Sequence, residues 1–161
     1  YGRQTELRRL ADFIQASQPV ALVGPEEIGK SSLLFHLMRP AVQESLGLGP
    51  EYLFTYTDCE ALGEGGEEVV FGRLAAELAA SLQGRGPPLE PALDEAAQRP
   101  APTTFEAAIR RLAGRGLRLV FLLDDFQHLS ANPNLGLSFF NRLASLTVRY
   151  GLVWVAAVDR S

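Results

Sequence analysis

A chain of 161 residues with 47% hydrophobic and 21% charged residues has the composition of one globular domain. Its single cysteine, Cys59, cannot form an internal disulfide, which excludes a disulfide scaffold. No apolar run is long enough to cross a bilayer and no targeting segment opens the sequence, so we expect a soluble, cytoplasmic protein with no membrane partner. The formal net charge of −4 at pH 7 argues against a nucleic-acid-binding face, which is usually basic.

The first half of the sequence alternates between helical and strand-like patterns. Apolar residues at helical spacing follow Thr5, and short runs rich in β-branched or aromatic residues indicate buried strands. In chain order, we expect a helix from Thr5 to Ile14, a strand over 20–23, a helix from Leu33 that stops at Pro40, a strand over 52–57 that ends at Asp58, and a helix from about Glu67 to Leu82.

The second half begins with glycines and prolines over residues 84–102, which predict a mobile loop, with one or two helical turns over 92–98. Thr103 and Glu106 have the spacing of a capping box, and Asn132-Pro133 resembles an N-cap followed by proline at the first helical position. We therefore expect a helix from Thr103 to Gly114, a strand over 117–123, a helix from Asn132 through Leu146, and a strand over 152–157.

Four short apolar strands that alternate with helices indicate an α/β fold, a three-layer αβα sandwich around a mostly parallel sheet. We interpret residues 1–161 as one core domain of a longer multidomain protein, because a fold of this kind normally continues with a further strand and a lid.

The strongest motif is a P-loop, G-x-x-x-x-G-K-[ST], between the first expected strand and the following helix. Its backbone N–H groups and the helix N-terminus cradle phosphates, while its lysine neutralises β and γ oxygens and its hydroxyl binds Mg²⁺. Lys30 and Ser31 hold these two positions, and Lys30 is the only lysine in the chain. We predict that Mg-ATP contacts Gly24, Pro25, Glu26, Glu27, Ile28, Gly29, Lys30, Ser31 and Ser32.

A second constellation, Asp124-Asp125, directly follows the apolar strand 117–123. In P-loop enzymes an acid at such a strand end holds the metal through water, and a second acid orients the attacking water. We assign the metal role to Asp124, together with Ser31, and the catalytic roles to Asp125 and Lys30.

Residues 2–7, 24–34 and 122–126 together resemble AAA-related ATPases of the STAND and Orc-like groups. The resemblance implies a sheet in the order 5-1-4-3-2, ATP as the nucleotide, and slow hydrolysis used as a switch or to drive assembly, with a homo-oligomer formed through this domain. It also implies that Gly2 and Arg3 lie near the adenine, and that flanking regions hold the sensing and effector modules.

Three departures from that pattern bear on activity. Glu26 and Glu27 place negative charges beside a polyphosphate, each costing only about 0.6 kcal/mol if the side chains point to water. Asp125 stands where many relatives have glutamate, which shortens the base and slows hydrolysis. The last strand lacks the usual polar sensor of the γ-phosphate, which leaves Asp159 or Arg160 as substitutes.

Several other polar residues have simpler interpretations. We expect Asp58 to act in a turn, and His36 and His128 lack the partners of a zinc site. Arginines at 142 and 149 are candidate arginine fingers but are expected to be exposed and solvated, and no aromatic residues interleave the cluster Arg110, Arg111, Arg115 and Arg118.

We predict slow Mg-ATP hydrolysis as a conformational or assembly switch in a STAND-type signalling or defence protein. Two alternatives stay open: a nucleotide-binding interaction module that does not hydrolyse ATP, and an Orc-like ATPase that loads on DNA. A small-molecule kinase fits less well, because paired acids after the third strand suit water attack better than acceptor binding.

Overall fold

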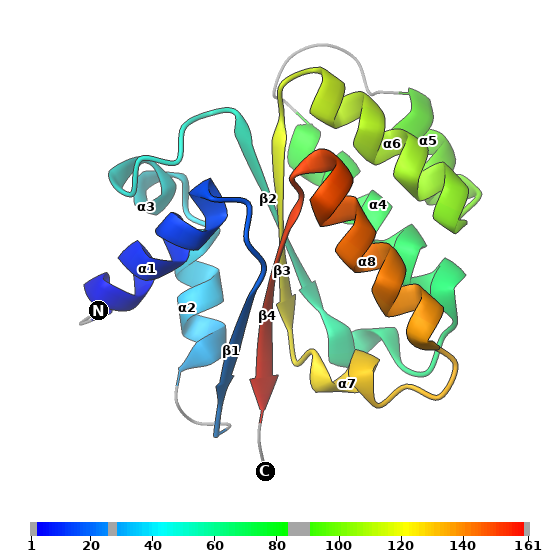
Figure 1. Ribbon diagram of the computed structural model, residues 1–161, viewed down its shortest axis with the longest axis horizontal. Helices are drawn as coiled ribbons and strands as arrows, with labels where there is room; N and C mark the ends of the chain where they lie inside the picture. The colour runs from blue at the N-terminus through cyan, green and yellow to red at the C-terminus, as the bar shows by residue number, and fades with distance from the viewer. Residues whose placement is uncertain (1–2, 26–28, 84–90, 160–161) are drawn as a thin grey trace.

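In the computed structural model, which describes residues 3–25, 29–83 and 91–159, four parallel strands form one sheet between two layers of helices (Figure 1). The strands are β1 (Val20–Gly24), β2 (Tyr52–Asp58), β3 (Arg118–Asp124) and β4 (Val153–Asp159). Their order is β1-β4-β3-β2, and every neighbouring pair is parallel. The predicted αβα architecture is confirmed. The observed order 1-4-3-2 agrees with the four corresponding strands of the expected order 5-1-4-3-2.

The register of the sheet brings the last residues of all four strands to one edge. Gly24 lies opposite Asp159, and Asp58 lies opposite Asp124. Side chains alternate between the faces of a strand, so Asp58, Asp124 and Asp159 belong to the face that also carries Phe54, Val120 and Val155 of the first helical layer's core. Three strands therefore end in a carboxylate on the same side of the same edge.

The first helical layer consists of α1 (Gln4–Gln15), α2 (Lys30–Leu37) and α3 (Pro40–Ser45). It packs on the sheet through a core that includes Leu7, Ile14, Leu34 and Leu37 from the helices, all at most 1% exposed. This packing places the N-terminal end of α2 near the carboxyl end of β1 (Figure 1).

The opposite layer consists of α4 (Glu67–Leu82), α5 (Pro91–Gln98), α6 (Pro102–Gly114) and α8 (Leu137–Tyr150), with the short elements η2 (Cys59–Leu62) and α7 (Gln127–Ser130) at the carboxyl edge. Its core is aromatic: Phe121 of β3 lies between Phe105 and Trp154, with ring centroids 6.1 and 4.8 Å away. Both faces of β3 are thus buried, which accounts for its continuous run of apolar residues.

Part of the stretch expected to be a loop is a packed helix. Residues 84–90 lie outside the described segments, but Pro91–Gln98 form α5, in agreement with the helical turns expected there. Leu93 and Ala96 of this helix are 0% exposed in the core with α4 and α6. Burial of these apolar side chains outweighs the breaker-rich composition around them.

Two predicted helix starts are wrong. Helix α6 begins at Pro102 rather than Thr103, and the hydroxyl of Thr104, not a Thr103–Glu106 box, accepts a 3.0 Å hydrogen bond from the Ala101 N–H. Proline suits the first helical position because its missing N–H would have no partner there.

Helix α8 begins at Leu137 after Gly136, not at Asn132-Pro133. The Asn132 side chain instead accepts a 2.8 Å hydrogen bond from the Asn134 N–H and donates one of 2.9 Å to the Gly65 carbonyl. Asparagine readily forms such a turn, and here its amide ties the turn to the loop that precedes α4.

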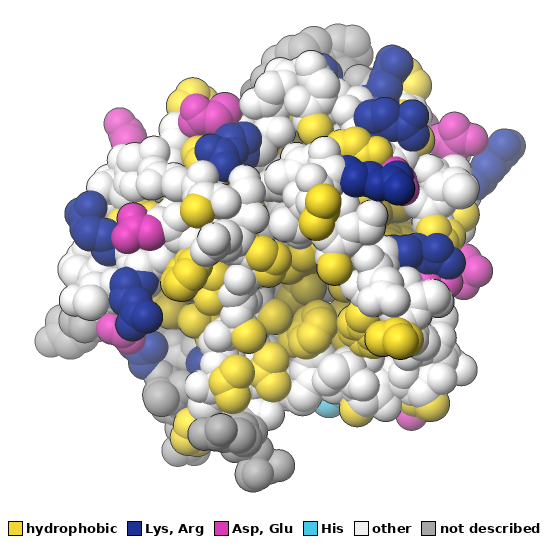
Figure 2. All heavy atoms as spheres, in the orientation of Figure 1, with side chains coloured by type: hydrophobic (Ala, Val, Ile, Leu, Met, Phe, Trp, Pro, Cys, Tyr) yellow, Lys and Arg dark blue, Asp and Glu magenta, His cyan; other side chains and the backbone are white. Residues whose placement is uncertain are grey.

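An apolar groove lies over β1 and β4 on the side of α8. Its lining includes Ala21, Phe126, Phe140 and Trp154, and Figure 2 shows hydrophobic side chains gathered over this part of the sheet. Within the described segments, no helix is both long enough and apolar enough to span a membrane.

Because α5 is packed in the core, we expect a substitution at its buried face to lower the stability of the domain strongly. Leu93→Ala removes a side chain that is 0% exposed, so we expect a loss of about 2–5 kcal/mol in the free energy of unfolding, measured by urea denaturation. The matched control is Leu137→Ala, at a residue 76% exposed, with an expected change below about 0.5 kcal/mol. Equal effects of the two substitutions would mean that α5 is not packed in solution.

Candidate nucleotide-binding site

The P-loop connects the carboxyl end of β1 to the N-terminus of α2, as predicted. Gly24 is the last residue of β1, and Gly29 is the N-cap of α2 with φ of 85°. The left-handed backbone at this position favours glycine, and the guanidinium of Arg3 lies against it, because a Cβ atom added at Gly29 would be 2.7 Å from Nη2 of Arg3. Predicted contacts at Glu26, Glu27 and Ile28 fall outside the described residues.

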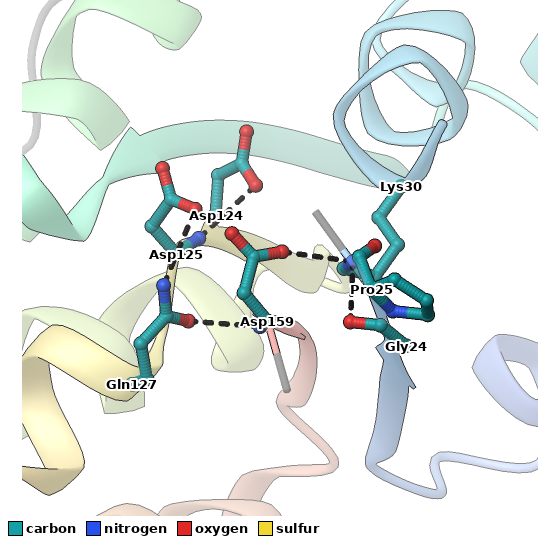
Figure 3. A network of polar contacts seen from close by, with 7 residues as sticks. All are labelled: Gly24, Pro25, Lys30, Asp124, Asp125, Gln127 and Asp159. Carbon is teal, nitrogen blue, oxygen red and sulfur yellow. Dashed lines mark hydrogen bonds and ion pairs between the residues drawn. The ribbon is translucent and has the colours of Figure 1, made fainter. Parts of the chain in front are cut away.

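The ammonium group of Lys30 is folded back onto the end of β1. Its side chain is 7% exposed, and Nζ donates to the carbonyl oxygens of Gly24 at 2.9 Å and Pro25 at 2.5 Å. It also forms an ion pair with Oδ1 of Asp159 at 2.8 Å (Figure 3). An ammonium has three protons to donate, so these three acceptors satisfy it completely.

Two other predicted nucleotide contacts lie in the first turn of α2. Ser31 and Ser32 are exposed in the first turn of the helix. A surface hollow is lined by Arg3, Gly29, Ser32, Leu33 and His36. The fold therefore brings Arg3 from the N-terminal segment to the P-loop, where it also forms a 3.3 Å ion pair with Glu6; Gly2 lies outside the described residues.

Asp124 is a buried carboxylate with a defined orientation. It is 4% exposed, Oδ2 accepts a 2.6 Å hydrogen bond from the Tyr56 hydroxyl, and Oδ1 accepts one of 3.0 Å from the Asp125 N–H. Burial, and then the hydrogen bond to Asp124, raise the pKa of Tyr56. The hydroxyl therefore stays protonated at neutral pH and can always donate to the carboxylate.

Asp125 lies next to Asp124 in a backbone conformation uncommon for residues other than glycine. Its φ is 52°, in the left-handed region. The amide nitrogen of Gln127 is 3.5 Å from Oδ1 of Asp125, and the amide oxygen of the same side chain accepts a 3.0 Å hydrogen bond from the Asp159 N–H (Figure 3). Burial, and then the charge of Asp124, raise the pKa of Asp125.

Sequence reasoning missed two of these residues. Tyr56 lies on β2, two positions before Asp58, and Gln127 begins α7. Tyr56 could have been found from the alternation of side chains along β2, because that alternation places it on the same face as the strand-terminal aspartates. No local signal identified Gln127.

The two other strand-terminal acids, Asp58 and Asp159, have different roles. Asp58 accepts a 3.0 Å hydrogen bond from the Glu60 N–H and so acts in the expected turn. Asp159, by contrast, contacts the P-loop lysine; Arg160 lies outside the described residues. Among the described residues no cluster of three or more histidine, cysteine, aspartate or glutamate side chains has the geometry of a metal site.

The remaining candidate residues lie elsewhere. Arg142 pairs with Glu67 at 3.3 Å and Arg149 with Glu106 at 2.9 Å, both within the layer of α4, α6 and α8. Arg118 donates to the Gln15 carbonyl at 2.9 Å from the first residue of β3, at the end of the sheet opposite the P-loop.

A family model described as "AAA ATPase domain" matches residues 1–155. The chain belongs to this family. The P-loop and the strand-terminal acids therefore lie in an AAA ATPase domain, whose nucleotide is ATP. No curated protein matches the chain.

Solved structures share the fold of this AAA domain. The ORC2 protein of Aeropyrum pernix, in ADPNP–ADP complexes, has a TM-score of 0.69 at 16% identity over 99% of this chain and 41% of its own. A Walker-type ATPase of Pyrococcus abyssi has 0.64 at 16% identity, over 99% and 45%. Cdc6p of Pyrobaculum aerophilum has 0.57 at 19% identity, over 99% and 39%. This AAA domain thus spans less than half the length of each of these proteins.

The raised pKa of Asp125 predicts a pH-dependent stability. Its ordinary pKa is 3.8; because the folded-state pKa lies above that, the folded protein loses stability as pH rises from 3.8 through the raised value. Asp125→Asn removes this loss and preserves the left-handed backbone, which asparagine tolerates. We expect the free energy of unfolding of the variant, relative to the unaltered domain, to increase across that window and then level off.

The measurement is urea unfolding at pH values from about 3 to 7, with the exposed Asp94→Asn as a control that carries the same charge change. A stability difference for Asp125→Asn that is independent of pH would contradict the assignment.

Proposed function

We propose that this AAA domain binds Mg-ATP and hydrolyses it slowly, and that its nucleotide state switches the conformation or assembly of a STAND-type signalling or defence protein. The observation that carries the proposal is the position of the Lys30 ammonium and the Asp124–Asp125 pair at one edge of the sheet. Contacts through Asp159 and Gln127 link them. A phosphate-binding cation and two acids on adjacent elements are the parts that phosphoryl transfer to water requires.

Phosphate binding is assigned to the P-loop and the start of α2. The first N–H groups of a helix have no partner within the helix and, with the helix dipole, attract anions. Lys30, the first residue of α2, supplies a positive charge, and Arg3 lies beside Gly29. Ser31, in the next position, is exposed, and its hydroxyl suits a metal ligand.

The donors at the carboxyl edge fit Mg²⁺ bound with a nucleotide. Mg²⁺ prefers oxygen ligands, keeps several waters and usually takes one or two protein groups plus phosphate oxygens. Each carboxylate oxygen of Asp124 accepts one hydrogen bond and keeps a further acceptor site for a metal-bound water. Ser31 and Asp124 would hold the ion, which would neutralise charge on the transferred phosphoryl group.

Asp125 is the proposed base. Its raised pKa makes it a better proton acceptor than an ordinary aspartate, and Gln127 restricts its carboxylate. Its side chain is one methylene shorter than the glutamate of many relatives. Misplacement of a base by about 1 Å can cost 10²-fold in rate, which supports slow rather than rapid turnover.

The wider role is inferred from the resemblance of the motifs to STAND ATPases. A cytoplasmic location and a homo-oligomer formed through this domain belong to the same proposal.

An Orc-like function is the second candidate, supported by the shared fold but opposed by the net charge of −4, which does not favour a DNA-binding face. The ion pair between Lys30 and Asp159 supports the third, a module that binds nucleotide without hydrolysing it.

Two substitutions separate binding from hydrolysis. Lys30→Met keeps the apolar stem and removes the charge, so we expect about 10–100-fold weaker binding of Mg-ATP by calorimetry. Asp125→Asn should keep binding within about threefold and reduce phosphate release by about 10²–10⁴-fold. The exposed Asp94→Asn is the control and should leave both measurements unchanged.

The outcomes distinguish the candidates. Mg-ATP binding that Lys30→Met leaves intact, or no binding by the unaltered domain, would overturn the proposal. Binding without phosphate release, in the unaltered domain at saturating Mg-ATP, would select the non-hydrolysing module.

A further inference from the structure

Asp159, the last residue of β4, contacts the P-loop lysine that is proposed to bind the nucleotide phosphates. Asp159 Oδ1 is 2.8 Å from the Lys30 ammonium, and the two side chains are 24% and 7% exposed. The contact follows from the sheet: β4 is hydrogen-bonded to β1, and Asp159 is paired in register with Gly24, the first residue of the P-loop. Strand alternation then directs the carboxylate to the α2 side, where Val155 and Ala157 also pack.

The contact leaves Lys30 no donor for a phosphate. Its three ammonium protons meet the carbonyl oxygens of Gly24 and Pro25 and the Asp159 carboxylate. A phosphate oxygen can therefore bind Nζ only by replacing one of these acceptors. Asp159 is the one that carries a negative charge, so it competes with the phosphate for the ammonium and also repels it.

The same carboxylate stabilises the domain without nucleotide. A lysine as buried as Lys30 is costly unless its charge is compensated, and Asp159 is its anionic partner among the described residues. The backbone holds that partner in place, because the Asp159 N–H donates to Gln127 and β4 is paired with β1 up to this residue.

We propose that Asp159 is an affinity-determining residue that acts as an internal substitute for phosphate on the P-loop lysine. The inference rests on the proposed nucleotide binding. Nucleotide binding is then an exchange, in which phosphate oxygens replace the Asp159 carboxylate on Lys30. The exchange weakens affinity and biases the domain toward its nucleotide-free state.

The decisive substitutions are Asp159→Asn and Asp159→Ala, with the exposed Asp94→Asn as the matched loss of one negative charge elsewhere. We expect both Asp159 variants to bind Mg-ATP about tenfold more tightly by calorimetry, the size of one competing charge-assisted hydrogen bond. Both should also melt at lower temperature without nucleotide. A merely structural ion pair would lower stability and affinity together, so opposite changes identify competition.

Because Lys30 is the only lysine, protein grown with ¹³C,¹⁵N-lysine gives a single side-chain Cε signal by NMR. We expect this signal to shift on Asp159→Asn without nucleotide, and to shift on addition of Mg-ATP to the unaltered domain. The first shift tests the ion pair in solution independently of any ligand, and Asp94→Asn should not produce it.

The calorimetric outcomes separate a failure of the inference from a failure of the proposed function. Equal or weaker Mg-ATP binding by folded Asp159 variants, alongside binding by the unaltered domain, would overturn the inference and leave the proposed function standing. Tighter binding by Asp159→Asn but not Asp159→Ala would indicate a new amide contact and would also overturn it. No binding by any of these proteins would remove the proposed function and the inference together.

Discussion

The charge of Lys30 is almost completely withdrawn from water, and the carboxyl edge of the sheet is arranged around it. An ammonium in that position requires acceptors for all of its protons and an opposite charge nearby. The loop supplies the acceptors through the carbonyls of Gly24 and Pro25, and it can turn back toward α2 because Gly29 adopts a positive φ. The opposite charge comes from Asp159. One buried ion pair thus depends on the loop, on the strand order and on helix packing together.

The parallel order of the sheet explains why charges accumulate at this edge. Strands that all point one way end together, so Asp58, Asp124 and Asp159 meet on one face. Such a cluster is electrostatically unfavourable unless its members are separated and hydrogen-bonded. The Tyr56 hydroxyl donates to the carboxylate of Asp124, and the Lys30 ammonium pairs with that of Asp159. Of the three strand-terminal acids, Asp58 accepts a hydrogen bond in a turn, Asp124 binds Tyr56 and the Asp125 N–H, and Asp159 contacts the P-loop lysine. This arrangement suits a site whose ligand is itself anionic only if Lys30 and a metal restore the balance of charge.

Most of the fold could be predicted from local patterns. Hydrophobic periodicity and the buried apolar runs located the strands, because a parallel sheet covered on both faces needs continuous apolar segments. The helical turns expected over 92–98 are part of α5, which Leu93 and Ala96 stabilise by packing. The errors lie at helix starts, where local capping chemistry competes with other contacts: α6 begins at Pro102 rather than Thr103. The cap expected at Asn132 failed for a related reason, since its amide binds the distant carbonyl of Gly65.

The sequence by itself determined the position of the P-loop motif and of the acids that follow the third strand, because both are runs of adjacent residues that can be recognised locally. Only the tertiary structure decided which distant residues hydrogen-bond to these acids and which acid pairs with Lys30. Tyr56 and Asp124 are 68 positions apart, and Gln127 and Asp159 are 32 apart. Such contacts exist because β4 lies between β1 and β3 and β2 pairs with β3 in a fixed register. The partner of Lys30 was therefore decided by strand order, a property that no local pattern contains.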